Sequence, residues 1–168
     1  MGCALSGELR IAATAVLDAC RARGLKIATA ESCTGGLVAG ALTEIAGSSD
    51  VVDRGFVTYS NAAKQQMLGV PASILRNHGA VSRETAEAMA RGALGKGGAD
   101  VVVAITGIAG PGGGSADKPV GLVHFAAASR AGTLTHAEMR YGDIGRAQVR
   151  HKSVLQALAM LKQMAEKL

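Results

Sequence analysis

Residues 101–106, Val-Val-Val-Ala-Ile-Thr, constrain the fold more than any other stretch of the sequence. Their side chains are largely β-branched and do not alternate with polar residues, which is typical of a strand buried on both faces of a sheet. Because such a strand needs helices on both faces to cover it, the segment predicts a layered α/β fold. Two earlier stretches, 25–30 and 55–59, predict further strands.

Helices are predicted between these strands, because apolar residues recur at helical spacing between a capping residue and a terminating glycine. Ser6 and Ser82 are the clearest caps, and Gly24 is one of the terminators. The expected helices span about residues 6–23, 37–45, 60–69, 82–95 and 144–168, with a turn or short helix at 71–77.

Two strands are predicted after the buried one, at 120–128 and 134–141, and a turn at Ala131-Gly132 joins them into an antiparallel hairpin. The whole pattern predicts a three-layer α/β sandwich, with a mostly parallel sheet, an antiparallel edge hairpin and helices on both faces. We expect a single domain over residues 1–168. Its core must come from aliphatic residues, because aromatic residues make up only 2% of the chain.

The formal net charge of +5 is compatible with an anionic ligand. A nucleic acid is a disfavoured partner, because Lys and Arg form no run and only two Tyr and two Phe are available for base stacking. The cysteines, Cys3, Cys20 and Cys33, are odd in number and widely spaced, which argues against a disulfide framework or structural zinc. We expect no metal and no other cofactor.

No secretory signal and no apolar stretch long enough to span a membrane is visible in the sequence. We therefore expect a cytoplasmic protein without a membrane segment. The edge hairpin and the Ala-rich helix faces lead us to expect a homo-oligomer.

The stretch 31–36, Glu-Ser-Cys-Thr-Gly-Gly, is predicted to form the turn between the first strand and the next helix. Ligands of such sheets bind beyond the carboxyl ends of strands, where a turn of this kind exposes a side chain and free helix amides. Structural capping, anion binding and nucleophilic catalysis are all compatible with the residues alone. The pattern matches neither the hydrolase G-x-S-x-G elbow nor a Walker A loop.

Ser32 is a nucleophile only if a base lies near it. The four histidines are scattered and are expected to be structural or exposed, so Lys64, after the second strand, is the candidate base. Tyr59, at the end of that strand, is expected to hydrogen-bond with Ser32 or Lys64. The alternatives remain open from spacing alone: Lys64 as a solvated helix residue, and Cys33 as a rival nucleophile with a pKa depressed by the helix N-terminus.

Two later segments are candidates for the rest of the site. Residues 106–119, Thr-Gly-Ile-Ala-Gly-Pro-Gly-Gly-Gly-Ser-Ala-Asp-Lys-Pro, form a long Gly-rich loop whose amides suit a phosphate, although a loop without a ligand is the alternative. Arg146 and Arg150 lie four apart near a helix start, where cations oppose the helix dipole. An anion held between them would explain this, and surface arginines paired with Asp143 or solvent are the alternative.

Several of these stretches together resemble one family, the CinA C-terminal domain family, which includes nicotinamide mononucleotide deamidases. The matching motifs are TAESCTGG, GFVTYSNAAKQQMLGV, HGAVS, TGIAGPGGGSADKPVGLV and GDIGRAQVRHKSV, and they extend from about Ser6 to the C-terminus. One motif departs from the family's Gly-Asp-Arg form, because Ile144 and Gly145 separate Asp143 from Arg146.

The resemblance implies a serine amidohydrolase that converts nicotinamide mononucleotide, a pyridine nucleotide, to nicotinate mononucleotide and ammonia. It implies a Ser-Lys pair at Ser32 and Lys64, with Tyr59 at the site. A non-catalytic nucleotide-binding module, or an interaction module linked to competence or damage, is the alternative. The residues expected to contact substrate are Cys33, Thr34, Gly35, Gly36, Asn61, Thr106, Gly107 and Arg146.

Overall fold

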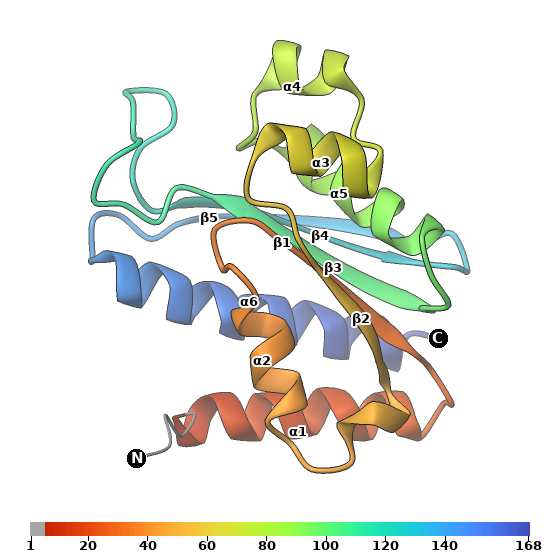
Figure 1. Ribbon diagram of the computed structural model, residues 1–168. Helices are drawn as coiled ribbons and strands as arrows, with labels where there is room; N and C mark the ends of the chain where they lie inside the picture. The colour runs from red at the N-terminus through yellow and green to blue at the C-terminus, as the bar shows by residue number, and fades with distance from the viewer. Residues whose placement is uncertain (1–5) are drawn as a thin grey trace.

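The buried strand predicted from the sequence, β3 (Val101–Gly107), lies at the centre of a five-stranded sheet. The computed structural model describes residues 6–168 and gives the strand order β2-β1-β3-β4-β5 (Figure 1). The other strands are β1 (Ile27–Glu31), β2 (Val52–Val57), β4 (Leu122–Ser129) and β5 (Leu134–Arg140). Strand β2 begins earlier than predicted and covers 52–57 rather than 55–59.

Strand β1 pairs in parallel with β2 on one side and with β3 on the other. Strand β4 is antiparallel to β3, and β5 is antiparallel to β4, so the predicted edge hairpin is confirmed. The chain passes from β1 to one neighbour and returns to the other, which makes the carboxyl end of β1 the point where strand order reverses. Ligands of open α/β sheets bind at such points.

Helices cover both faces of the sheet, which confirms the three-layer sandwich (Figure 1). One face carries α1 (Gly7–Arg21), α2 (Leu37–Thr43) and α6 (Arg146–Glu166). The opposite face carries α3 (Asn61–Leu68), α4 (Ala72–His78) and α5 (Arg83–Gly95), and a 3₁₀ turn at Ser48–Asp50 precedes β2.

The predicted serine caps are confirmed. The hydroxyls of Ser6, Ser60 and Ser82 accept hydrogen bonds from backbone amides in the first turns of α1, α3 and α5. The last helix begins later than predicted, because Gly145 has a φ of 90° and cannot belong to the helix.

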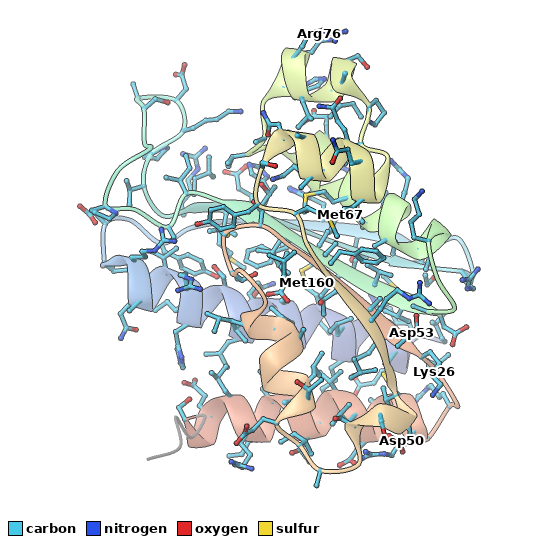
Figure 2. All side chains as sticks on the ribbon, in the orientation of Figure 1. Lys26, Asp50, Asp53, Met67, Arg76 and Met160 are labelled. Carbon is cyan, nitrogen blue, oxygen red and sulfur yellow. The ribbon has the colours of Figure 1, made fainter. Side chains whose placement is uncertain are left out.

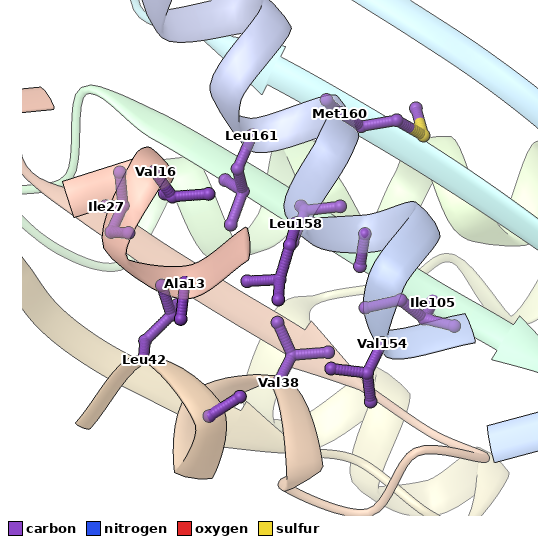
Figure 3. Close-up of a cluster of buried hydrophobic side chains, with 14 of the residues drawn as sticks. Ala13, Val16, Ile27, Val38, Leu42, Ile105, Val154, Leu158, Met160 and Leu161 are labelled. Carbon is purple, nitrogen blue, oxygen red and sulfur yellow. The ribbon is translucent and has the colours of Figure 1, made fainter. Parts of the chain in front are cut away.

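The core lies in two layers, one on each face of the sheet. The larger layer packs α1, α2 and α6 on the sheet through residues such as Val16, Leu42, Ile105 and Leu158 (Figure 3). The other layer is rich in alanine, which lets α5 approach the sheet closely. The apolar residues Val154, Leu158, Leu161 and Ala165 of α6 are buried, whereas Leu168, beyond the end of the helix, is 43% exposed.

The two ends of the sheet differ in character. At the amino ends of the parallel strands, Lys26 donates its backbone amide to Asp100 at 2.8 Å and its ammonium to the carbonyl of Asp50 at 2.5 Å. Figure 2 shows Lys26, Asp50 and Asp53 together at this end. The loops that follow β1, β2 and β3 leave the opposite end, so the functional candidates gather there.

Within residues 6–168, no helix is both long and apolar enough to cross a membrane. Cys20 and Cys33 are buried free thiols, and Cys3 lies outside the described residues.

Candidate active site

Ser32 and Lys64 are in direct contact at the carboxyl end of β1. The Lys64 Nζ atom lies 3.0 Å from Ser32 Oγ. The Lys64 side chain is 1% exposed, so it is not the solvated helix lysine that spacing alone allowed, and Ser32 is 9% exposed. Burial lowers the pKa of the Lys64 ammonium, because desolvation disfavours the charged form.

The remaining partners of Lys64 are backbone carbonyls. Its Nζ lies 2.8 Å from the carbonyl of Thr58 and 3.5 Å from that of Tyr59. In the part of the chain that the structure describes, no carboxylate forms an ion pair with Lys64. No carboxylate in this part of the chain therefore offsets the desolvation that shifts Lys64 towards its neutral form.

The turn that carries Ser32 is fixed by backbone and side-chain bonds. The Ser32 amide donates to the carbonyl of Ile105 at 2.9 Å, and the Gly35 amide donates to the carbonyl of Ser32 at 3.0 Å. The buried carboxylate of Glu31 accepts the amides of Val38 and Ala39 in the first turn of α2, at 2.9 and 3.1 Å. This arrangement satisfies helix donors that lack intrahelical partners.

Gly35 and Gly36 allow the backbone to bend in this turn. Their φ angles are 58° and 98°, in the left-handed region that L side chains avoid. Not all amides of the turn are free for a ligand, because the Gly35 amide already has an acceptor within the turn.

Cys33 is an inert thiol in this structure. Its side chain is 6% exposed, and burial raises its pKa to about 12. The expected depression of the pKa by the helix N-terminus is therefore wrong, because desolvation outweighs the nearby charges. Ser32 remains the candidate nucleophile, because it has a candidate base in contact.

Tyr59 and Arg146 form a pair at the mouth of the site. The Arg146 guanidinium donates to the Tyr59 hydroxyl at 2.9 Å and to the carbonyl of Gly110 at 3.0 Å. Tyr59 is 60% exposed, and the predicted hydrogen bond from its hydroxyl to Ser32 or Lys64 is not formed. The reason is that the phenol points outward while its own carbonyl faces Lys64.

Arg150 lies one turn further along α6 and does not share an anion with Arg146. Its guanidinium donates to the carbonyls of Cys33 and Thr34, each at 3.2 Å. The predicted anion between the two arginines is therefore not supported at Arg150. Thr34 itself is completely buried.

The Gly-rich loop lies beside Ser32 and Lys64. The Thr106 hydroxyl donates to the carbonyl of Ala80 at 2.7 Å and ties β3 to the loop before α5. Gly107 is a glycine for packing reasons, because a Cβ there would lie 2.7 Å from the Val123 side chain and 2.9 Å from the Leu122 carbonyl.

These elements surround a cavity of about 260 Å³, a size suited to a small molecule. Seven of the predicted residues line it: Ser32, Cys33, Tyr59, Lys64, Thr106, Gly107 and Arg146. Thr34, Gly35, Gly36 and Asn61 are not among its lining residues, and Asn61 is an exposed residue at the start of α3. The segments Ala80–Val81 and Ile108–Gly113 complete the wall.

The family model of the CinA C-terminal domain matches residues 10–165. The chain belongs to this family.

Solved structures of CinA-type proteins have the same fold as this CinA C-terminal domain. The crystal structure of the competence/damage inducible protein CihA from Agrobacterium tumefaciens is 56% identical, with a TM-score of 0.95 and full coverage of both chains. A CinA superfamily protein from Escherichia coli is 36% identical, with a TM-score of 0.88, and the match covers 96% of this chain and 94% of that one.

Curated relatives of this CinA C-terminal domain carry several names. A CinA-like protein of Anaeromyxobacter dehalogenans is 52% identical over 141 residues, which are 84% of this chain and 34% of that protein. The chain thus spans about a third of the length of such relatives. A protein of Enterobacter agglomerans named nicotinamide-nucleotide amidohydrolase PncC is 55% identical over 126 residues, which are 74% of this chain and 77% of that protein.

The histidines of this CinA C-terminal domain lie away from Ser32 and Lys64, and none lines the cavity described above. His124 and His136 contact each other across β4 and β5, with 3.0 Å between ring nitrogens, and burial lowers both pKa values. In residues 6–168, no group of three or more His, Cys, Asp or Glu is arranged to hold a metal ion.

Sequence reasoning missed two anchors of the Ser32 turn. Glu31 was placed in the turn without a role, and Arg150 was considered only as a partner of Arg146, Asp143 or solvent. The four-residue spacing of the two arginines was the available signal for Arg150, but it could not show that its partners are carbonyls far away in the chain.

Proposed function

We propose that this chain is an amidohydrolase in which Ser32 attacks the carboxamide of nicotinamide mononucleotide and Lys64 acts as the base. The observation that carries the proposal is the 3.0 Å contact between Lys64 Nζ and Ser32 Oγ beside the cavity. A serine hydroxyl is a weak nucleophile unless a base accepts its proton, and a lysine can do so when burial lowers its pKa.

The surroundings of Lys64 suit its neutral form. A neutral amine has two N–H groups and one lone pair, whereas the ammonium has three N–H groups and no acceptor. The carbonyls of Thr58 and Tyr59 can only accept, so they take the two N–H groups. The lone pair is then available to the Ser32 hydroxyl, which is the arrangement that proton transfer needs.

The reaction proceeds in two halves. Ser32 Oγ forms a bond to the carboxamide carbon as its proton passes to Lys64 Nζ. The tetrahedral intermediate then breaks its C–N bond, Lys64 returns the proton to the leaving nitrogen, and ammonia departs. Water attacks the resulting ester while Lys64 accepts a proton, and the return of that proton to Ser32 Oγ releases nicotinate mononucleotide.

The Cys33 amide is the best-placed donor for the oxyanion. Cys33 lines the cavity, and its N–H has no acceptor in any other residue among those described. Thr34 is completely buried, so its amide is less accessible to a substrate. Donors aimed at the developing oxyanion commonly contribute about 3–4 kcal/mol to lowering the barrier.

The phosphate is assigned to the Gly-rich wall and Arg146. Ala109, Gly110, Gly112 and Gly113 line the cavity, and their amides have no backbone acceptor within residues 6–168. Consecutive free amides bind anions, and a guanidinium beside them adds positive charge. The PncC-named relative supports a nicotinamide nucleotide as the substrate.

The test is ammonia release from nicotinamide mononucleotide, compared with simple amides that lack the ribose phosphate. We expect release from the mononucleotide, with equimolar nicotinate mononucleotide. Tight binding of the mononucleotide without ammonia would instead favour a non-catalytic nucleotide-binding module.

A further inference from the structure

We propose that Arg150 is a positioning residue that sets the oxyanion donor beside Ser32, an inference that rests on the proposed function. Arg150 does not line the cavity, and both of its described hydrogen bonds go to carbonyls of the turn after Ser32. It therefore acts on the reaction through the backbone and not through the substrate.

Arg150 reaches the oxyanion donor through a chain of planar peptide units. It holds the Thr34 carbonyl, which belongs to the same rigid unit as the Gly35 amide. That amide donates to the Ser32 carbonyl at 3.0 Å, and the Ser32 carbonyl shares its unit with the Cys33 amide. In a trans peptide the C=O and N–H point in opposite directions, so fixing the Ser32 carbonyl fixes the direction of the Cys33 N–H.

The charge of Arg150 adds to this geometry. A cation that donates to a carbonyl polarises the peptide unit, and linked hydrogen bonds strengthen one another in a buried site. The Cys33 N–H at the end of the chain is thereby made a stronger donor to an oxyanion. The guanidinium is suited to this task, because its rigid fork spans two acceptors, which a lysine cannot do.

Glu31 holds the other side of the same turn. Its carboxylate fixes the first amides of α2, while Arg150 fixes the carbonyls of Cys33 and Thr34. The backbone of the turn is therefore held from two sides, by the buried Glu31 side chain at its start and by Arg150 from α6. A site needs such support because small displacements of reacting groups slow a reaction strongly.

The experiment compares the variants Arg150→Met and Arg150→Lys with the control Lys152→Met. Lys152 is an exposed residue of the same helix. For Arg150→Met we expect kcat for ammonia release to fall about 100-fold with KM changed less than about threefold. Arg150→Lys should fall between Arg150→Met and wild type, and Lys152→Met should match wild type. Thermal unfolding of each variant shows whether the fold is retained.

A second readout does not depend on the nucleotide. A fluorophosphonate ester phosphonylates an activated serine, with fluoride leaving and the serine proton passing to the base. We expect Ser32 to be labelled in wild type and Arg150→Met to be labelled about 100-fold more slowly. Added guanidinium ion should restore part of the rate in Arg150→Ala, which loss of packing alone would not allow.

The outcomes separate the two proposals. If no ammonia is released but the labelling rate depends on Arg150, the assignment of nicotinamide mononucleotide as the substrate is overturned and the role of Arg150 is supported. Equal labelling of wild type and Arg150→Met, or no labelling of Ser32 in wild type, overturns the role of Arg150. If Arg150→Met does not fold, Arg150→Lys decides: a wild-type rate overturns the proposal, and a slower rate in a folded protein supports it.

Discussion

The amine of Lys64 and the hydroxyl of Ser32 lie 3.0 Å apart, although 32 positions separate the two residues in the chain. The sheet brings them together, because β1 and β2 are parallel neighbours and the segments after both strands leave from one end. Apart from the control positions, Ser32, Lys64 and the other residues whose replacement is considered next lie at this end of the sheet.

Replacement of Ser32 by alanine removes the nucleophile. We expect Ser32→Ala to lose ammonia release by at least about 10³-fold while it retains binding of the mononucleotide. Ser115→Ala, an exposed serine of the Gly-rich loop, is the matched control and should stay active. Full activity in a folded Ser32→Ala variant would contradict the mechanism.

Replacement of Lys64 by methionine removes the base and also a buried amine. We expect Lys64→Met to lose at least about 10²-fold in kcat. In wild type, activity should rise with pH through a Lys64 pKa that burial has lowered below 10.5. A rise centred at or above the ordinary lysine value would show that Lys64 is not the titrating base.

The same lowered pKa predicts how stability depends on pH. Between the folded pKa of Lys64 and the unfolded value of 10.5, the unfolded chain binds the extra proton and the folded chain does not. The free energy of unfolding contributed by Lys64 therefore rises with pH across this window and is lowest below it. In urea unfolding, the free energy of unfolding of wild type should increase with pH relative to that of Lys64→Met.

Arg146 is expected to recognise the phosphate. We expect Arg146→Met to raise KM for nicotinamide mononucleotide about 10- to 100-fold, the usual range for a charged hydrogen bond, with a smaller effect on kcat. Nicotinamide riboside, which lacks the phosphate, should be hydrolysed equally by wild type and variant. Arg140→Met, which removes an exposed arginine of β5, serves as the control. An equal loss on both substrates would argue against a phosphate role.

Gly107 is expected to tolerate no side chain. A Cβ there would lie 2.7 Å from the Val123 side chain and 2.9 Å from the Leu122 carbonyl. We expect Gly107→Ala to lower the free energy of unfolding by about 1–3 kcal/mol, the range for overpacking. Gly98→Ala, where a Cβ meets nothing within 4 Å, should change it little. Chemical unfolding of both variants measures the difference.

Cys33 is expected to resist alkylation. Because burial raises its pKa to about 12, almost no thiolate forms at pH 8 in the folded protein. Iodoacetamide should therefore modify Cys33 far more slowly in the native state than in urea, as peptide mass spectrometry would show. Rapid native-state modification that blocks activity would return Cys33 to consideration as a nucleophile.

Much of the fold follows from local patterns. The β-branched run of β3, the serine caps of α1, α3 and α5, and the edge hairpin all appear where local rules place them. These features depend on interactions within a few residues or on simple burial, so they are visible in one dimension. We predicted the start of β2 too late, because the polar residues at the beginning of this strand have a weak preference for strand structure.

The sequence by itself determined the layered fold, the turn at 31–36 and the family to which its motifs point. Only the tertiary structure decided between the two alternatives for Lys64, a solvated helix lysine or a candidate base, because it buries the side chain and lowers its pKa. It likewise separated Arg146, at the cavity, from Arg150, at the Cys33 and Thr34 carbonyls. The physical reason is that desolvation and hydrogen-bond partners depend on what distant segments bring to a side chain, which local sequence does not encode.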